Sequence, residues 1–322
     1  GYSQSEIKHS KKTKKLNWHF VADNVHDFMW AADPNYVHDI LTTEAGIDLH
    51  FFYKDKEEIK ENWANLQAKT AEAMDFFSKN IGPYPYKQYS VIHGGDGGME
   101  YAMSTLVTGE RSFGSLVGVM VHELAHSWFQ HVLATNESKH AWMDEGFTSF
   151  ISSLCMNQIM DQNRDNPFQR SYDSYIRLAK SGNEQPLTTH SDRYNFNYAY
   201  SVGAYSKGAV FLAQLGYVIG QDNILKTIRR YYEDFKFSHP TPNDIKRTAE
   251  RVSGFHLDWY LTDFAQTTNT IDYGIQNVEG VNLNSSQITL ERKGLMPMPI
   301  DLVVVLKDGS MQSYYIPLQE AR

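Results

Sequence analysis

The chain has 322 residues, a formal net charge of −8, 41% hydrophobic residues and 13% aromatic residues. This composition is typical of a globular protein and excludes extensive disorder, and the acidic balance argues against nucleic acid as a partner. No apolar stretch reaches the roughly 18 residues that a membrane-spanning helix needs, so we expect a soluble protein with no membrane span.

The length exceeds the usual size of one domain, so we expect one large domain with smaller pieces attached. Cys155 is the only cysteine, which excludes an intrachain disulfide and favours a buried, inert thiol. The sequence starts at Gly1 with neither an initiator methionine nor a signal peptide, so we expect a piece of a longer polypeptide. It leaves the compartment open between the cytoplasm and export with a leader removed.

The first third of the sequence changes from β-like to helical patterning near Lys56. From Ile59 to Phe77, apolar residues recur at spacings of three and four, which predicts an amphipathic helix that closes before Gly82 and Pro83. Short apolar runs bounded by polar or glycine-rich turns predict strands. The expected elements are β-like runs at 17–22 and 48–53, the helix, strands at 89–93 and 105–108, and a glycine-rich turn at 94–98.

The middle of the chain is predicted to be mostly helical and the last fifty residues β-rich. Thr241 precedes Pro242 and Asp244, a helix-start pattern with proline in the first turn and a capping partner. Asp308 and Gly309 form a hairpin-turn signal. The expected elements are helices at 204–218, 223–235 and 241–254, then strands at 287–291, 300–306 and 313–318.

The sequence His122-Glu123-Leu124-Ala125-His126 has metal-ligand spacing. Residues four apart lie on one face of a helix, so the two imidazoles can bind one ion while Glu123 lies beside it. Glu145, nineteen residues after His126, is far enough along the chain to return on a second helix as a third ligand. Two histidines and one glutamate leave a fourth position of a zinc ion for water.

Such a five-residue match also occurs by chance on helices that bind nothing. Here the apolar run 116–121 leads into it and Trp128 and Phe129 follow, so the helix is expected to be buried and its polar side chains need partners. A third histidine six residues after the second is absent, because position 132 is Val132. His131 is one place short and is interpreted as a surface or packing residue.

The pattern is extended by Gly-Gly-Met-Glu-Tyr at 97–101, Trp-Met-Asp-Glu-Gly-Phe at 142–147 and Tyr-Ser-Lys-Gly-Ala at 205–209. Together with the zinc motif, these segments resemble the M1 family of zinc aminopeptidases. Residues 97–101, Gly-Gly-Met-Glu-Tyr, are similar to the family's Gly-x-Met-Glu-Asn motif. Residues 142–147 are similar to its Trp-x-x-Glu-Gly-Phe segment, and residues 205–209 to its Tyr-x-Lys-Gly-Ala segment. Tyr101 departs from the family's Asn, which puts the handling of substrate in doubt. Asp144 also replaces an Asn, and the Gln-His pair at 130–131 replaces Gly-Asn.

The resemblance implies an α+β, thermolysin-like zinc peptidase domain, with a small mixed sheet and a mostly helical lobe, flanked by partial β domains. We expect residues 1–54 to be the C-terminal part of an N-terminal β domain. Residues 55–272 would be the catalytic domain, and residues 273–322 the start of a C-terminal β-sandwich-like domain. The missing parts of these flanking domains, from the same polypeptide, are expected partners.

The resemblance also implies roles for single residues. One zinc ion per chain would be held by His122, His126 and Glu145, with Glu123 as general base. Tyr205 would stabilise charge on the carbonyl oxygen. Glu100 would bind the free N-terminus of a peptide, and its neighbours in the motif would line the substrate site: Gly97, Gly98, Met99 and Tyr101.

Two alternatives stay open from the sequence. The first is a zinc endopeptidase or a hydrolase of another small substrate, which the altered Tyr101 permits. The second is a catalytically impaired zinc-binding and peptide-binding module, because the flanking domains are expected to be missing. The role of Asp144 is also open between a partner for a metal ligand and a helix-capping residue.

Overall fold

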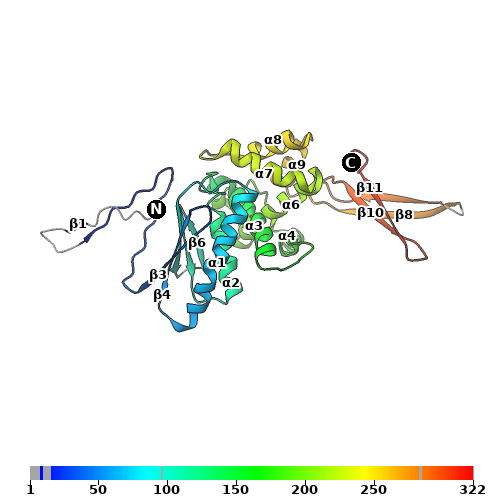
Figure 1. Ribbon diagram of the computed structural model, residues 1–322. Helices are drawn as coiled ribbons and strands as arrows, with labels where there is room; N and C mark the ends of the chain where they lie inside the picture. Colours follow the sequence, from blue (N-terminus) through cyan, green and yellow to red (C-terminus); the bar gives the residue numbers. More distant parts are fainter. Residues whose placement is uncertain (1–7, 10–15, 96, 283–284, 322) are drawn as a thin grey trace.

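The computed structural model describes residues 8–9, 16–95, 97–282 and 285–321. A five-stranded sheet and a group of helices pack against each other to form the body of the molecule (Figure 1). The strand order is β3-β4-β5-β7-β6. The strands are β3 Tyr36–Thr42, β4 Asp48–Lys54, β5 Gln88–Gly94, β7 Ser104–Thr108 and β6 Gly98–Tyr101.

The sheet is mixed. β4, β5 and β7 run parallel, while β3 at one edge and β6 at the other are antiparallel to their neighbours. A parallel pair needs a long crossover, and α1 (Glu57–Asn80) supplies it between β4 and β5. The apolar face predicted for this helix is the buried one, because Ile59, Trp63, Leu66, Ala73 and Phe77 all point into the core.

The remaining helices form the second layer (Figure 1). α6 is apolar on all sides and runs through the middle of this layer, since ten of its twelve residues are buried. The helices are α2 Phe113–Ala125, α3 Glu137–Ile159, α4 Gln169–Ser181, α5 Asn197–Ser201, α6 Gly208–Ile219, α7 Gln221–Phe235, α8 Pro242–Ser253 and α9 Asp258–Leu261. Shorter turns are the 3₁₀ turn η1 Ser191–Arg193 and the π-helical turns η2 Val202–Lys207 and η3 Thr262–Gln266.

The mixed sheet and helical lobe agree with the predicted α+β class, but several local predictions differ. The strand expected at 17–22 is wrong, because β2 covers only Leu16–Asn17 and the following residues are irregular. β3 and α4 were not predicted. The glycine-rich turn was expected to run to residue 98, yet Gly98 begins the edge strand β6. An edge strand is paired on one side only, so glycine is tolerated there.

The predicted domain boundary after residue 54 divides the sheet. β3 and β4 lie within residues 1–54, but β4 pairs with β5 along five residue pairs, from Asp48 and Gln88 to Phe52 and Ile92. Phe51 and Tyr53 of β4 are buried in the common core. β3 and β4 therefore form one sheet with β5, β7 and β6, and the position of the domain boundary stays a prediction.

Two β-hairpins follow the helices and extend away from the body (Figure 1). The first pairs β8 (Tyr273–Asn282) with β9 (Ser285–Arg292), and the second pairs β10 (Ile300–Val305) with β11 (Met311–Ile316), before the short α10 (Leu318–Ala321). Three of these strands were predicted and β8 was not. The boundary at residues 272 and 273 stays a prediction.

Two expectations about single features can be compared with the structure. Cys155 lies on α3 and is fully buried, as expected, and this burial raises the pKa of its thiol to about 12, which disfavours the reactive thiolate. Among the residues that the structure describes, no helix is both long enough and apolar enough to cross a membrane.

Candidate metal centre

The last turn of α2 carries two of the predicted ligands. Leu116, Val117, Met120 and Val121 are buried along the helix, and they fix which side of it faces the core. His122 and Glu123 follow, and His126 is the C-terminal cap residue of α2. Both imidazoles and the Glu123 carboxyl group are thereby directed toward the space between α2 and α3.

α3 carries the third predicted ligand. Its N-terminus is capped by Asn136, whose side chain accepts a hydrogen bond from the Lys139 backbone N–H at 3.2 Å. Two flanking aromatic side chains, Trp142 and Phe147, are buried and fix the rotation of the helix. Glu145 therefore points back toward α2, and its side chain is 12% exposed.

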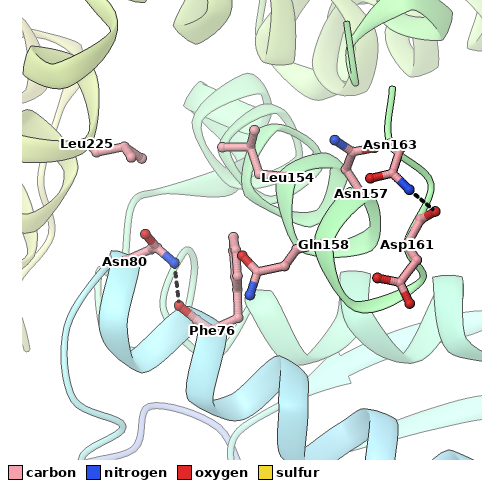
Figure 2. Close-up of a pocket in the computed structure, with 8 residues that line it drawn as sticks. All are labelled: Phe76, Asn80, Leu154, Asn157, Gln158, Asp161, Asn163 and Leu225. Carbon is pink, nitrogen blue, oxygen red and sulfur yellow. Dashed lines mark hydrogen bonds between the residues drawn. The ribbon is translucent and has the colours of Figure 1, made fainter. Parts of the chain in front are cut away.

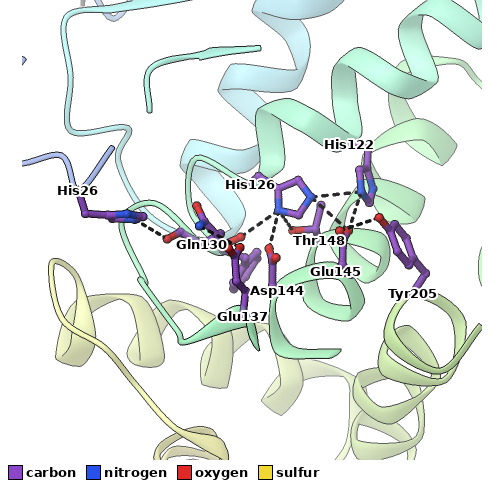
Figure 3. Close-up of polar contacts among 10 residues, drawn as sticks. His26, His122, His126, Gln130, Glu137, Asp144, Glu145, Thr148 and Tyr205 are labelled. Atoms are coloured by element: carbon purple, nitrogen blue, oxygen red, sulfur yellow. Dashed lines mark hydrogen bonds and ion pairs between the residues drawn. The ribbon is translucent and has the colours of Figure 1, made fainter. Parts of the chain in front are cut away.

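The three predicted ligands meet at the corners of a nearly equilateral triangle (Figure 3). His122 Nε2 and Glu145 Oε2 are 3.2 Å apart, the two Nε2 atoms of His122 and His126 are 3.2 Å apart, and His126 Nε2 and Glu145 Oε2 are 3.3 Å apart. Ligand atoms about 2.0–2.1 Å from a tetrahedral zinc ion lie about 3.3–3.4 Å from one another. The spacing and the donor types of this triangle therefore fit zinc.

The other nitrogen of His126 is surrounded by acceptors. Nδ1 lies 2.7 Å from Asp144 Oδ1, 3.1 Å from the Phe129 carbonyl oxygen and 3.2 Å from Thr148 Oγ1. These partners favour the proton on Nδ1, which leaves the Nε2 lone pair directed into the triangle. Asp144 is thus the partner of a candidate ligand and does not cap a helix.

Glu123 lies beside the triangle and is only 6% exposed. Its Oε2 is buried without a hydrogen-bond partner among the described residues. Burial raises the pKa of Glu123 to about 8, with the carboxyl groups of Glu100 and Glu145 acting in the same direction. The positive charge of a bound metal ion would favour the ionised form and act against these effects.

Tyr205 reaches the triangle from the π-helical turn η2. Its hydroxyl donates a hydrogen bond to Glu145 Oε1 at 2.6 Å, and its ring stacks on His122 with the ring centroids 5.7 Å apart (Figure 3). Burial and the Glu145 carboxylate both raise the pKa of the phenol. Tyr205 therefore remains a hydrogen-bond donor at neutral pH.

A cavity of about 330 Å³ opens onto the triangle, and the edge strand β6 forms one wall of it. Gly98, Met99 and Glu100 line this wall. Gly98 is needed for the close approach, because a Cβ atom there would lie 2.3 Å from Glu123 Oε1. Glu100 is 9% exposed, and burial raises the pKa of its carboxyl group.

Two residues predicted to bind substrate do not line the cavity. Gly97 lies in the turn before β6, where its N–H donates to Thr108 Oγ1 at 2.8 Å. Tyr101 is at the far end of β6 and does not contribute to the cavity wall either. The alternation of a β-strand accounts for part of this arrangement, since neighbouring side chains point to opposite faces.

The cavity also contains residues that the sequence did not indicate. Glu137, in the first turn of α3, has a carboxyl oxygen within 4.8 Å of those of Glu100 and Asp144. The helix is kinked between Glu137 and Glu145, because the backbone of His140 is non-helical, so helical spacing from Glu145 does not predict the position of Glu137. Ser191 and Tyr200 reach the cavity from segments between α4 and η2, and no local sequence pattern predicts that they line it.

His131 is buried as a packing residue, in agreement with its interpretation from the sequence. Its ring stacks on that of His26 with the centroids 5.5 Å apart, and neither ring nitrogen has a hydrogen-bond partner among the described residues. Burial lowers the pKa of His131 to about 3. His26 is in turn within 3.0 Å of the Gln130 carbonyl oxygen (Figure 3).

A second cavity, of about 450 Å³, lies between α1, α3 and α7 (Figure 2). Its polar side chains are mostly amides, among them Asn80, Asn157 and Asn163. None of the residues that line it belongs to the predicted site. The candidate chemistry is therefore confined to the cavity beside the triangle.

Comparisons with known proteins match these observations. A family model described as the peptidase family M1 domain matches residues 67–264, more than half of the chain. Aminopeptidase B of Mus musculus is 26% identical over 216 residues, which are 57% of this chain and 32% of the relative. A leukotriene A-4 hydrolase homolog of Botryotinia fuckeliana is 25% identical over 248 residues, which are 70% of this chain and 36% of the relative. The chain thus spans about a third of the length of these relatives.

Solved structures show a similar fold. The M1 zinc metallopeptidase of Deinococcus radiodurans superposes with a TM-score of 0.57 at 20% sequence identity. The superposition covers 72% of this chain and 51% of that one. At this identity the likeness concerns the fold, so the roles of single residues have to be argued from their geometry.

Proposed function

Because the chain belongs to peptidase family M1, we propose that it is a zinc-dependent aminopeptidase that hydrolyses the N-terminal peptide bond. The observation that carries this proposal is the triangle of His122, His126 and Glu145, with spacings that suit zinc and with Glu123 and Glu100 in the same cavity. One zinc ion per chain is expected. Bound there, zinc would lower the pKa of a coordinated water to about 7 and act as a Lewis acid.

Glu123 is proposed as the general base. Its carboxyl group is next to the metal ligands but outside the triangle, and its Oε2 is free of other hydrogen bonds within the described chain. It can therefore accept a proton from the attacking water and deliver that proton to the leaving amine. Burial raises the pKa of Glu123 and so makes its carboxylate a stronger base for the first transfer, while a bound metal ion would act against this shift.

Tyr205 is proposed to donate a hydrogen bond to the carbonyl oxygen as negative charge develops on it. The hydroxyl is already at the edge of the triangle, 2.6 Å from Glu145 Oε1, and is exposed to the cavity. A substrate oxygen that enters there can replace Glu145 as its acceptor. Donors of this kind contribute about 3–4 kcal/mol to the stabilisation of a transition state.

Glu100 is proposed to bind the α-ammonium group of the substrate. A carboxylate in the cavity wall can form a charge-assisted hydrogen bond to the ammonium and so place the first peptide bond at the triangle. A substrate without this charge leaves Glu100 buried and unpaired, which costs several kcal/mol. The site would therefore select the peptide bond next to a free N-terminus.

The requirement for a free N-terminus can be tested by comparing the hydrolysis of a short peptide with that of its N-acetyl form. We expect the zinc-loaded protein to hydrolyse the free peptide at least about 100-fold faster, because only the free peptide pairs with Glu100. Glu100→Ala should remove most of this preference by slowing hydrolysis of the free peptide. Glu58→Ala, which removes an exposed carboxylate on α1, is the matched control and should behave as the wild type.

The same assay separates the two alternatives. An endopeptidase would cleave both peptides at comparable rates, at bonds inside the chain. A binding module would hydrolyse neither peptide, although both would still bind. Either result with zinc-loaded wild-type protein would contradict the aminopeptidase proposal.

A further inference from the structure

Tyr205, to which the proposed function assigns the oxyanion contact, lies in an unusual piece of backbone. The turn η2 (Val202–Lys207) is π-helical, with one more residue per hydrogen-bonded turn than an α-helix. Tyr205 itself is 37% exposed, so burial of its own ring contributes little to its position. Besides the stacking on His122 and the hydrogen bond to Glu145, the backbone of η2 therefore sets where the phenol lies.

One end of η2 is fixed by a buried ion pair. Lys207 is fully buried, and its Nζ is 2.6 Å from Glu184 Oε1 and 3.4 Å from the Thr267 carbonyl oxygen. The rings of Tyr175 and Phe264 also face the ammonium group, with Nζ 5.4 and 5.6 Å from their centroids. The Glu184 side chain is 5% exposed. The pair thus links η2 to the loop after α4 and to the end of η3.

The next residue fixes the same turn to α3. A Cβ atom on Gly208 would lie 2.8 Å from Gly146 Cα and 2.8 Å from the Trp142 carbonyl oxygen. The backbone at the start of α6, directly after η2, is therefore in contact with the backbone of α3 one residue away from Glu145. Tyr205 lies within η2, three residues before Gly208, and its hydroxyl donates a hydrogen bond to Glu145 Oε1.

We propose that the Lys207–Glu184 ion pair is a positioning device for catalysis: it holds η2 in its π-helical form and so sets the distance between the Tyr205 hydroxyl and the metal triangle. This inference rests on the role proposed for Tyr205. A pair that served only folding would be replaceable by apolar residues, since such replacements of buried ion pairs are often neutral or stabilising. The proposal instead requires that the replacement folds and moves Tyr205.

The first test is structural and does not depend on activity. Lys207→Met combined with Glu184→Leu replaces the pair by apolar side chains of similar size, and a crystal structure of the zinc-loaded double variant gives the Tyr205 position. We expect the Tyr205 hydroxyl to leave hydrogen-bonding distance of Glu145. An unchanged Tyr205 hydroxyl would overturn the proposal, whether or not the protein is an aminopeptidase.

The second test is a kinetic cycle in the presence and absence of the Tyr205 hydroxyl. In the wild-type background, the double variant should lose about 10- to 100-fold in kcat with KM changed less than about twofold. In the Tyr205→Phe background, which already lacks the hydroxyl, the same double variant should cost less than about twofold further. Lys79→Ala with Asp75→Ala removes an exposed ion pair on α1 and is the matched control.

The outcomes are distinct. An equal loss of kcat in both backgrounds would mean that the pair supports the whole domain, and the positioning role would be wrong. Lys207→Gln combined with Glu184→Gln removes both charges without leaving one of them buried and unpaired, and it covers the case in which the apolar double variant does not fold. If this variant is unfolded as well, the pair is a folding element and the proposal is overturned. Failure of wild-type protein to release amino acids counts against the proposed function, while the crystal structure still decides the inference.

Discussion

Glu123 is the residue on which hydrolysis depends in this account, although it is no ligand in the metal triangle. Its neighbours His122 and His126 carry the candidate ligand atoms, and Glu123 lines the cavity with a carboxylate oxygen that has no hydrogen-bond partner in the described part of the chain. Metal binding and proton transfer are therefore assigned to different side chains of one helical turn. Single substitutions can separate them.

Glu123→Gln keeps the size of the side chain and removes the base. We expect zinc content equal to that of the wild type and a kcat reduced by at least about 100-fold, because proton transfer by a positioned side chain contributes about this much or more. Metal analysis and steady-state kinetics on the same preparation check both halves. His122→Ala is the control that should lose zinc, and loss of zinc from Glu123→Gln would show that the assigned roles are wrong.

The sequence predicted the residues of the triangle more readily than those of the cavity. His122 and His126 are four residues apart on one helix, so helical geometry alone brings them together. Tyr200 and Ser191 reach the cavity only because α4 and the segments after it fold back across α3. Their positions depend on tertiary packing, which no local pattern encodes.

Among the elements around the site, α3 packs backbone to backbone against η2 and the start of α6. A Cβ atom on Gly146 would lie 2.5 Å from Gly208 Cα and 2.9 Å from the Ala204 carbonyl oxygen. Both obstacles are backbone atoms, so no side-chain rotation can relieve the clash. Glycine at Gly146 is required by space and not by a left-handed conformation.

Gly146→Ala should therefore destabilise the protein by about 2–3 kcal/mol, since overpacking of a well-packed interior costs this much. Gly118→Ala on α2 is the matched control, because the nearest atom to its new Cβ would be Met156 Cε at 3.8 Å. It should stabilise by about 0.5–1 kcal/mol through helix propensity. Urea unfolding of the two variants measures both changes, and an equal effect of both substitutions would contradict the packing argument.

Element prediction succeeded where one physical pattern dominated. The spacing of apolar residues in α1 matches the buried face of that helix, because a long amphipathic helix has many residues that agree. It failed for β6, where Gly98 and the preceding glycines indicated a turn, and for β3, whose short alternating pattern is mostly half-buried. Both strands form because β6 pairs with β7 and β3 pairs with β4. Local sequence patterns do not predict which segments pair.

At the scale of the whole molecule, the site lies where the sheet meets the helical layer. The edge strand β6 supplies Glu100, α2 and α3 supply the triangle, and η2 supplies Tyr205. The two C-terminal hairpins stand apart from this body and expose apolar side chains, such as Ile275 at 60% and Val305 at 63%. Such faces fit the predicted start of another domain at residue 273, which stays a prediction.

The order in which products leave a peptide shows whether the protein is a zinc-dependent aminopeptidase. A pentapeptide with five different residues is incubated with zinc-loaded protein, with chelated protein and with protein to which zinc has been returned, and the products are followed by mass spectrometry. A zinc aminopeptidase releases single residues one after another from the N-terminus, and we expect this result only when zinc is present. Internal fragments as first products, or equal cleavage after zinc has been removed, would contradict it.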